Sequence, residues 1–325
     1  MTNAAIRIDR HLTADDLAKT LRRDVHDGLT ASPKELPPKW FYDEQGSALF
    51  ERITELDEYY PTRSERAILT RRAAEIATVT GADTLVELGA GSGEKTRLLL
   101  DALHAAGNLR RFVPVDVSGD FLAEAAERIA ADYPETVVHA VIADFERHLT
   151  LLPAEGRRLV AILGSTIGNH PPQRRRSLLT DLRATLTPDD RLLVGMDLVK
   201  EPARLRAAYD DASGVTAEFN RNVLRVLNRE LGADFAPGDF AHLAVWDATA
   251  EWIEMRLRAQ RDVCARVEAL DLTVDFTAGE EMRTEISAKF RPETARADLA
   301  AAGLALEHWW TDPAGDFALA LARPD

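Results

Sequence analysis

The chain has only one cysteine, Cys264, among its 325 residues. A single cysteine allows no disulfide within the chain and excludes structural zinc or iron–sulfur sites built from several cysteines. The eight histidines show no spacing typical of metal ligands, so we expect no metal site. No apolar run approaches the roughly 20 residues that cross a membrane, and the first residues lack a secretory core. We therefore expect a cytoplasmic protein without a membrane partner.

Positive charge is also in short supply. Lysine and arginine number 40 against 54 aspartate and glutamate residues, which gives a formal net charge of −14. A surface this acidic repels phosphate backbones, so we expect no nucleic-acid partner. Hydrophobic residues make up 46% of the chain and charged residues 29%, which is typical of a folded globular protein and excludes general disorder.

From residue 83 onward, strand and helix patterns alternate along the chain. Short apolar runs predict strands at 84–88, 112–116, 137–143, 159–163 and 191–198, separated by amphipathic helices. A helix at 292–302 and strands at 304–310 and 316–322 return to this style at the end of the chain. The pattern predicts an α/β fold with a parallel sheet, whose ligands bind at the carboxyl ends of the strands.

Residues 200–286 follow a different pattern. Helices are predicted at 202–212 and 216–231, followed by strands at 242–247, 252–260, 262–269 and 271–276. Within 252–259 apolar and charged residues alternate, which indicates an antiparallel, half-buried strand. We interpret 200–286 as an insertion that packs with 1–60 into an α+β substrate domain. Residues 61–199 and 287–325 then form the cofactor domain.

Two features of the first 80 residues complete the predicted organisation. A helix is expected near 13–28, and an aromatic-rich stretch follows at 40–60. Thr62 and Glu65 have the Thr-x-x-Glu spacing of a capping box, which predicts that a helix begins there and runs to about residue 78.

The sharpest motif is Glu87-Leu88-Gly89-Ala90-Gly91-Ser92-Gly93, between a predicted strand and a predicted helix. A dinucleotide fingerprint would place a third glycine where this chain has Glu94, which disfavours a nicotinamide oxidoreductase. The spacing instead resembles the first motif of class I S-adenosylmethionine-dependent methyltransferases, whose cofactor has a cationic sulfonium and no phosphate. A tight turn without any ligand stays open as the alternative.

Further candidates follow the next three strands. Asp116 follows the second strand, where a carboxylate can accept from both ribose hydroxyls, and Asp144 and Phe145 follow the third, where they can meet adenine. The segment 164–169 follows the fourth strand, where Asn169 can bind an acceptor and the Gly164 carbonyl can hold an amine. Each residue alone is equally well an ordinary loop residue, but their succession at strand ends favours a cofactor site.

Five segments then make a more specific resemblance. They are Lys39-Trp40-Phe41-Tyr42-Asp43 and residues 58–63, 87–95, 163–169 and 289–293. With them the chain resembles, from about residue 20 to 323, the histidine-specific methyltransferases of ergothioneine biosynthesis. The resemblance implies a Rossmann-like class I methyltransferase domain, mostly parallel with an antiparallel final strand. It also implies transfer of three methyl groups from S-adenosylmethionine to the α-amino nitrogen of L-histidine, giving hercynine. Separately, we expect a monomer.

The resemblance also implies site residues. The cofactor contacts would be Tyr42, Gly89, Lys95, Asp116, Asp144 and Phe145. The substrate contacts would be Asn169 and Tyr209 for the carboxylate, Gly164 for the α-amine, and Tyr59, Met255, Glu285 and Ser287 for the imidazole. No catalytic base is assigned, although Tyr42 would lie near the amine.

The residues themselves agree with part of this assignment. In an extended segment Glu285 and Ser287 point the same way, so a carboxylate and a hydroxyl can converge on one imidazole. A surface acid beside a polar neighbour is the alternative for this pair. For the whole chain, methylation of another free amino acid or small amine stays open, as does a non-catalytic cofactor-binding regulatory module.

Overall fold

The computed structural model describes residues 6–91 and 93–325. Ser92 of the glycine-rich motif and residues 1–5 of the predicted substrate domain lie outside the described residues. The chain divides into two compact units. Unit 1 contains residues 1–12, 61–199 and 289–325, and unit 2 contains residues 13–60 and 200–288. No helix within the described ranges is both long and apolar enough to span a membrane.

Unit 1 is built on an eight-stranded sheet in the order β1-β5-β4-β3-β6-β7-β14-β13, counted over its described residues. The strands are β1 (Ile6–Arg10), β3 (Thr84–Leu88), β4 (Arg111–Asp116), β5 (Val137–Ile142), β6 (Arg158–Ile162), β7 (Arg191–Asp197), β13 (Leu304–Thr311) and β14 (Phe317–Pro324). The first six pair in parallel, whereas β14 runs antiparallel to both β7 and β13. The predicted mostly parallel sheet with an antiparallel final strand is confirmed.

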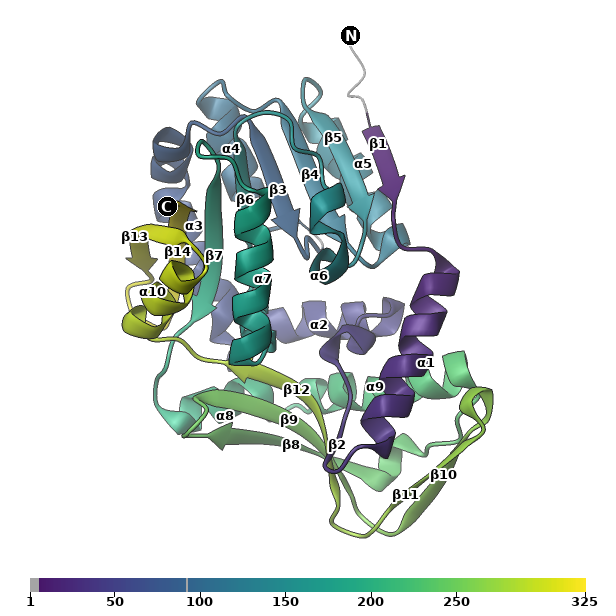
Figure 1. The fold of residues 1–325 in the computed structure, drawn as a ribbon. Helices are drawn as coiled ribbons and strands as arrows, with labels where there is room; N and C mark the ends of the chain where they lie inside the picture. The colour runs from purple at the N-terminus through teal and green to yellow at the C-terminus, as the bar shows by residue number, and fades with distance from the viewer. Residues whose placement is uncertain (1–5, 92) are drawn as a thin grey trace. The chain divides into compact units, whose positions relative to one another are not determined.

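Helices and short turns connect these strands. They are α3 (Tyr60–Thr80), α4 (Arg97–Ala105), α5 (Gly119–Asp132), α6 (Phe145–His148), η2 (Leu149–Leu151), η3 (Thr166–Asn169), α7 (Pro172–Thr185) and α10 (Pro292–Ala301). Helix α5 packs on β4 and β5, and α10 packs on β13. In Figure 1, α7 crosses the near face of this sheet. The strands have almost continuous apolar runs because both faces of a parallel sheet are covered.

Two expectations at the start of the chain are wrong. Residues 1–60 were assigned entirely to the second domain, but Ile6–Arg10 forms β1 and pairs with β5 in the large sheet. The predicted capping box at Thr62 and Glu65 also fails, because α3 already begins at Tyr60. Glu65 therefore lies inside a helix, and its side chain is buried and bonded elsewhere.

Unit 2 combines helices with a small antiparallel sheet. Its helices are α1 (Ala14–Thr30), η1 (Pro38–Phe41), α2 (Glu44–Glu55), α8 (Pro202–Tyr209), α9 (Val215–Leu231), η4 (Pro237–Asp239) and η5 (Glu268–Leu270). Its strands are β2 (Lys34–Glu35), β8 (Phe240–Asp247), β9 (Trp252–Ala259), β10 (Val263–Val267), β11 (Leu272–Phe276) and β12 (Glu281–Ala288). Strands β2, β12, β9 and β8 lie side by side in that order, and β10 and β11 form a separate hairpin (Figure 1).

The two faces of the four-stranded sheet differ, as the alternation along 252–259 predicts. Ile253, Met255, Leu257 and Ala259 are almost fully buried and belong to a core formed with α9 and the aromatic segment 40–60. Helices α8 and α9 both pack on β8 and β9. The core therefore covers the apolar face of β9.

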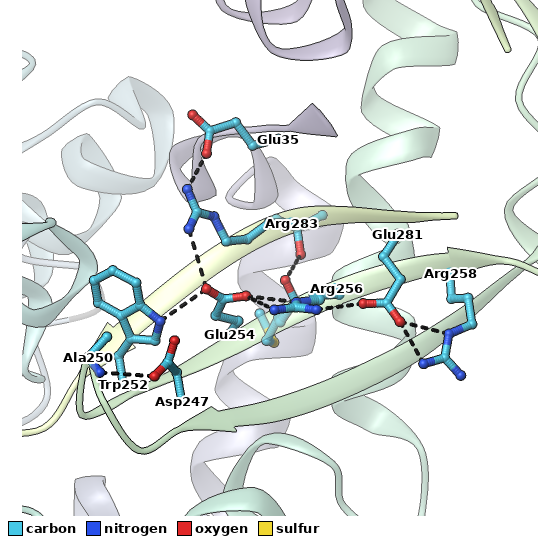
Figure 2. Close-up of polar contacts among 11 residues, drawn as sticks. Glu35, Asp247, Ala250, Trp252, Glu254, Arg256, Arg258, Glu281 and Arg283 are labelled. Carbon is cyan, nitrogen blue, oxygen red and sulfur yellow. Dashed lines mark hydrogen bonds and ion pairs between the residues drawn. The ribbon is translucent and has the colours of Figure 1, made fainter. Parts of the chain in front are cut away.

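The other face has a ladder of ion pairs that joins β9 to β12 (Figure 2). Glu254, which is 6% exposed, accepts from the Trp252 indole at 3.0 Å and from Arg256 at 2.7 Å, and it pairs with Arg283 at 3.3 Å. Glu281 pairs with Arg256 at 2.7 Å and with Arg258 at 2.6 Å. Glu281 of β12 lies directly opposite Arg258 of β9, and Arg283 of β12 reaches Glu254 of β9, so a shift of register would separate these pairs. The ladder thus helps to fix which residues of β9 and β12 lie opposite each other.

Candidate active site

The glycine-rich turn after β3 leaves an open cradle. Gly89, Gly91 and Gly93 have φ values of 74°, 52° and 72°, which side chains rarely tolerate. A Cβ atom added to Gly91 would meet nothing within 4 Å, and one added to Gly89 would meet only the Phe145 ring, at 3.9 Å. Backbone at this turn therefore borders free space next to Phe145, as a closely bound ligand requires.

Asp116 at the end of β4 faces the same turn. Its carboxylate accepts from the backbone N–H of Gly91 at 3.1 Å and from that of Ser118 at 3.0 Å. Burial raises the pKa of this carboxyl above its ordinary value, and the amide donors of Ser118 and Gly91 oppose the rise. The contacts hold Asp116 beside the glycine turn, where a carboxylate suits a ribose diol.

Asp144 and Phe145 follow β5 at the same edge of the sheet. Asp144 caps α6, since its side chain accepts from the Glu146 N–H at 3.0 Å, and its own N–H donates to His148 Nδ1 at 3.2 Å. The capped turn fixes the Phe145 ring near Gly89.

Glu87, the first residue of the motif, has a different environment from the other acids. It is 3% exposed, and the Thr96 hydroxyl donates to it at 2.5 Å. Burial raises the pKa of Glu87 to about 8, and the bond from Thr96 opposes the rise. The bond between Glu87 and Thr96 therefore joins the end of β3 to the residue that precedes α4.

Lys95 forms an ion pair with Glu65, a residue that the sequence reasoning treated as a helix cap. The same Glu65 carboxylate accepts from the backbone N–H of Gly164, at 2.9 Å from one oxygen and 3.0 Å from the other. The glycine-rich segment and the segment after β6 are thereby joined through one buried acid.

The segment after β6 contains the remaining candidates of unit 1. Gly164 and Ser165 both have left-handed backbone, with φ values of 71° and 59°. The Ser165 hydroxyl accepts from the Asp197 N–H at 3.0 Å, and the Thr166 hydroxyl donates to the Leu163 carbonyl at 2.8 Å. These bonds fix the turn that presents Asn169, which is half-buried at the end of η3.

In unit 2 the predicted tyrosines form a chain of ring contacts. Tyr42 meets Phe50 edge-on at 5.6 Å between ring centroids and Phe219 at 5.5 Å. Tyr59 meets Phe50 at 6.1 Å and Tyr209 at 6.3 Å. Phe219 on α9 was missed by the sequence reasoning, since a phenylalanine at helical spacing is equally typical of core packing.

The remaining unit 2 candidates gather on β12 and β9. The hydroxyls of Tyr209 and Ser287 lie 2.7 Å apart, and both residues are buried. Glu285 lies directly opposite Met255, and Ser287 opposite Ile253. Paired residues of antiparallel strands share a face, so Glu285 and Ser287 both lie on the face of Met255. An acid and a hydroxyl beside an apolar wall are well suited to an imidazole.

This arrangement depends on a shift of register between Arg283 and Glu285. Without that bulge, Met282, Thr284 and Ile286 would share a face by strict alternation, and Glu285 would point away. Thr284, which is fully buried, has its hydroxyl 2.6 Å from Asn220 Oδ1 and 3.0 Å from the Met255 carbonyl. The bulge therefore has its own hydrogen-bond partner on α9.

A series of buried hydrogen bonds leads from Thr284 through Asn220 and His242 to Tyr209. Its side-chain nitrogen lies 2.8 Å from His242 Nδ1 and 3.1 Å from the Arg256 carbonyl. His242 Nε2 lies 2.7 Å from the Tyr209 carbonyl, which can only accept, so the proton belongs on Nε2. Burial lowers the pKa of His242, which favours this neutral form. No sequence pattern indicated this hydrogen-bonded group, because its members lie on four different elements: Thr284 on β12, Asn220 on α9, His242 on β8 and Tyr209 on α8.

The structure thus groups the predicted residues by unit. Gly89, Lys95, Asp116, Asp144, Phe145, Gly164 and Asn169 lie at the carboxyl edge of the large sheet in unit 1. Tyr42, Tyr59, Tyr209, Met255, Glu285 and Ser287 belong to unit 2.

The strand order β5-β4-β3-β6-β7-β14-β13, with a glycine turn after β3 and acids after β4 and β5, defines a class I S-adenosylmethionine-dependent methyltransferase. A family model described as "Histidine-specific methyltransferase, SAM-dependent" matches residues 21–324. The chain belongs to this family of enzymes.

Similar proteins agree with the family. A histidine N-alpha-methyltransferase of Mycolicibacterium smegmatis is 59% identical over 98% of this chain and 99% of its own length. One of Mycobacterium tuberculosis is 57% identical over the same shares. Ergothioneine biosynthesis protein 1 of Neurospora crassa is 31% identical over 86% of this chain and 32% of its own length.

Proposed function

We propose that this chain transfers three methyl groups from S-adenosylmethionine to the α-amino nitrogen of L-histidine and so forms hercynine for ergothioneine biosynthesis. The observation that carries the proposal is the 59% identity to a histidine N-alpha-methyltransferase over nearly the whole of both chains. Because the alignment covers nearly all of both chains, no large insertion or deletion separates their acceptor sites. We further propose that the enzyme acts as a monomer.

In the proposed site, unit 1 binds the cofactor, which supplies a methyl group activated by its sulfonium. The open turn at Gly91 and the Phe145 ring beside Gly89 fit an adenosine, and Asp116 fits its ribose diol. We assign Lys95 to the amino-acid end and Asp144 to the adenine, with Tyr42 as a further contact. These residues bind the cofactor and orient its methyl group, which is the main contribution that a protein makes to a displacement reaction.

We assign the histidine contacts residue by residue, as the resemblance to the family implies. Glu285 accepts a hydrogen bond from one ring nitrogen, and the Ser287 hydroxyl donates one to the other. Met255 forms the apolar wall, and Tyr59 lies beside the ring. Tyr209 and Asn169 bind the carboxylate, and the Gly164 carbonyl holds the amine. The imidazole offers the Glu285 carboxylate a ring N–H donor, which leucine and phenylalanine lack, so we expect the pocket to favour histidine over these amino acids.

The attacking amine must be neutral and becomes a quaternary ammonium as methyl groups are added. Tyr42 and Phe50, which contact each other edge-on, offer ring faces for this growing cation. No side chain is assigned as an obligatory base, because each released proton can also leave to water.

A product assay tests the proposal directly. The purified protein is incubated with methyl-labelled S-adenosylmethionine and a panel of free amino acids that includes histidine, tryptophan, phenylalanine and leucine, and products are identified by mass. We expect label in trimethylated histidine and little in the others. Label mainly in another amino acid would support the alternative of a different acceptor, and no label in any product would support a regulatory cofactor-binding module.

A further inference from the structure

Glu65 of α3 is a fully buried acid whose partners lie in two segments assigned to different ligands. Its side chain is 0% exposed. It forms an ion pair with Lys95, which follows the glycine-rich turn. Both of its oxygens also accept from the Gly164 N–H, at 2.9 and 3.0 Å. Burial of a carboxylate is costly, so an acid kept here must be fully bonded.

The neighbouring backbone is shaped to admit this acid. A Cβ atom added to Gly195, in the middle of β7, would lie 2.1 Å from Glu65 Oε1. Glycine inside a strand weakens it and often marks a close approach by another group. No positive φ explains Gly195; the Glu65 carboxylate, together with the Phe317 ring at 3.2 and 3.3 Å, occupies the space that a side chain would need.

Lys95 and Gly164 are also close to each other. A Cβ atom added to Gly164 would lie 3.5 Å from Lys95 Nζ. The Lys95 side chain keeps 22% of its surface exposed, and its ammonium has three donors. One donor is used by Glu65, so the direction of the others is set by that ion pair.

We propose that Glu65 is a positioning residue that sets Lys95 for the amino-acid end of the cofactor and, through the Gly164 N–H, sets the segment that presents the acceptor amine. The inference rests on the proposed function, because Lys95 and Gly164 are assigned there to the cofactor and the amine. Glu65 touches neither ligand in this account and acts through its two partners. Its carboxylate fixes the ammonium and the Gly164 peptide relative to each other.

Calorimetric titration with two ligands tests this role. S-adenosylhomocysteine has the amino-acid end of the cofactor, whereas methylthioadenosine lacks it. We expect Glu65→Gln to weaken S-adenosylhomocysteine about 10-fold or more, the usual effect of losing a charged contact, while methylthioadenosine changes less than about twofold. Lys95→Ala should show the same selective loss, and the double variant should lose little more than either. Glu75→Gln, on the same helix and paired with Arg72 and Trp310, is the matched control.

A second measurement concerns Gly164. Histidine affinity in the presence of saturating S-adenosylhomocysteine should fall in Glu65→Gln and stay unchanged in Glu75→Gln. Equal losses of affinity for S-adenosylhomocysteine and methylthioadenosine would overturn the inference, because a general effect on the fold lowers the affinity for both ligands. If Glu65→Gln does not fold, Glu65→Asp, which keeps the charge but shortens the reach, is measured in the same way and must show the same selective loss.

The outcomes separate this inference from the proposed function. A selective loss in Lys95→Ala with none in either Glu65 variant would overturn the role of Glu65 and leave the cofactor assignment intact. No selective loss in Lys95→Ala would overturn both.

Discussion

The hydroxyl oxygens of Tyr209 on α8 and Ser287 on β12 lie 2.7 Å apart. In the proposed complex Tyr209 binds the carboxylate of histidine and Ser287 binds its ring, so one contact joins the two ends of the substrate. Histidine allows this because its Nδ1 is the ring nitrogen nearer the α-carbon. Ser287 is therefore expected to bind Nδ1, which leaves Nε2 to Glu285.

The first prediction follows from this contact. Tyr209→Phe and Ser287→Ala should each weaken histidine binding, and the double variant should lose less than the sum of the two, because each single change already disrupts the shared hydrogen bond. Histidine titration in the presence of S-adenosylhomocysteine gives the coupling energy, which we expect at about 0.5–3 kcal/mol. Strictly additive losses would mean that the two hydroxyls act independently on the substrate.

A second prediction concerns the bulge that turns Glu285 toward Met255. Thr284→Val keeps the side-chain shape but removes the hydroxyl bonded to Asn220. Leaving the buried Asn220 oxygen without this donor should lower the free energy of unfolding by about 1–3 kcal/mol. Denaturant titration measures the loss, with the exposed Thr273→Val on β11 as control.

The same variant should also reduce the preference for histidine over other amino acids, because the bulge sets the direction of Glu285. A stable Thr284→Val protein with unchanged preference would show that the bulge holds without this bond.

Much of the fold could be predicted because it depends on local patterns. The strands of the large sheet are continuous apolar runs, and β9 alternates cleanly, so periodicity alone identifies them. Strand β12 was not among the predicted strands, and its alternation alone would have put Glu285 on the wrong face, because the register shift between Arg283 and Glu285 is not visible in the sequence. Strand β1 was missed because it is short and exposed, and its pairing with β5 involves residues more than 120 positions away.

The candidate site divides in the same way. Gly89, Asp116 and Asp144 were predicted because they follow strands of a parallel sheet, whose carboxyl ends share an edge. The residues that bond to the site residues could not be predicted. In the sequence Glu65 resembles a helix cap, and His242 and Asn220 resemble ordinary polar residues. Their partners lie far away in the sequence, and a pattern in one segment cannot reveal them.

A third prediction concerns pH. Burial raises the pKa of Glu87 from 4.5 to about 8, so the folded state keeps a proton that the unfolded state loses earlier. The stability contributed by this proton is complete below pH 4.5 and is lost as the pH rises toward 8. Glu87→Gln has no such proton. The free energy of unfolding of Glu87→Gln, relative to that of wild type, should therefore rise as the pH increases from 4.5 to about 8, by at most about 1.4 kcal/mol per pH unit.

Chemical denaturation at several pH values measures this difference, with Glu127→Gln on the exposed side of α5 as control. Parallel curves for Glu87→Gln and wild type would contradict a protonated Glu87 in the folded protein.

The fourth prediction tests the cofactor cradle. Asp116→Ala should weaken S-adenosylhomocysteine by about 10- to 150-fold, because a charged hydrogen-bonding partner of the ribose is worth roughly 1.5–3 kcal/mol. Thermal melting should show a folded protein, and the exposed Asp189→Ala should bind as wild type does. Unchanged affinity in Asp116→Ala would place the ribose elsewhere.

The most direct test of the central claim, that this site reads the imidazole of histidine, is a competition assay. Wild type, Glu285→Ala, and Glu285→Ala combined with Met255→Val are each offered equal amounts of histidine, tryptophan, phenylalanine and leucine with S-adenosylmethionine, and methylated products are quantified by mass. We predict that wild type methylates histidine almost alone, because leucine and phenylalanine offer Glu285 no ring N–H donor and the tryptophan ring is larger than the imidazole that the site is proposed to hold. Glu285→Ala should lose this preference more than it loses total methyl transfer, and the double variant should accept tryptophan. An unchanged preference for histidine in both variants would contradict the claim and point to Tyr59 and its aromatic neighbours as the residues that read the ring.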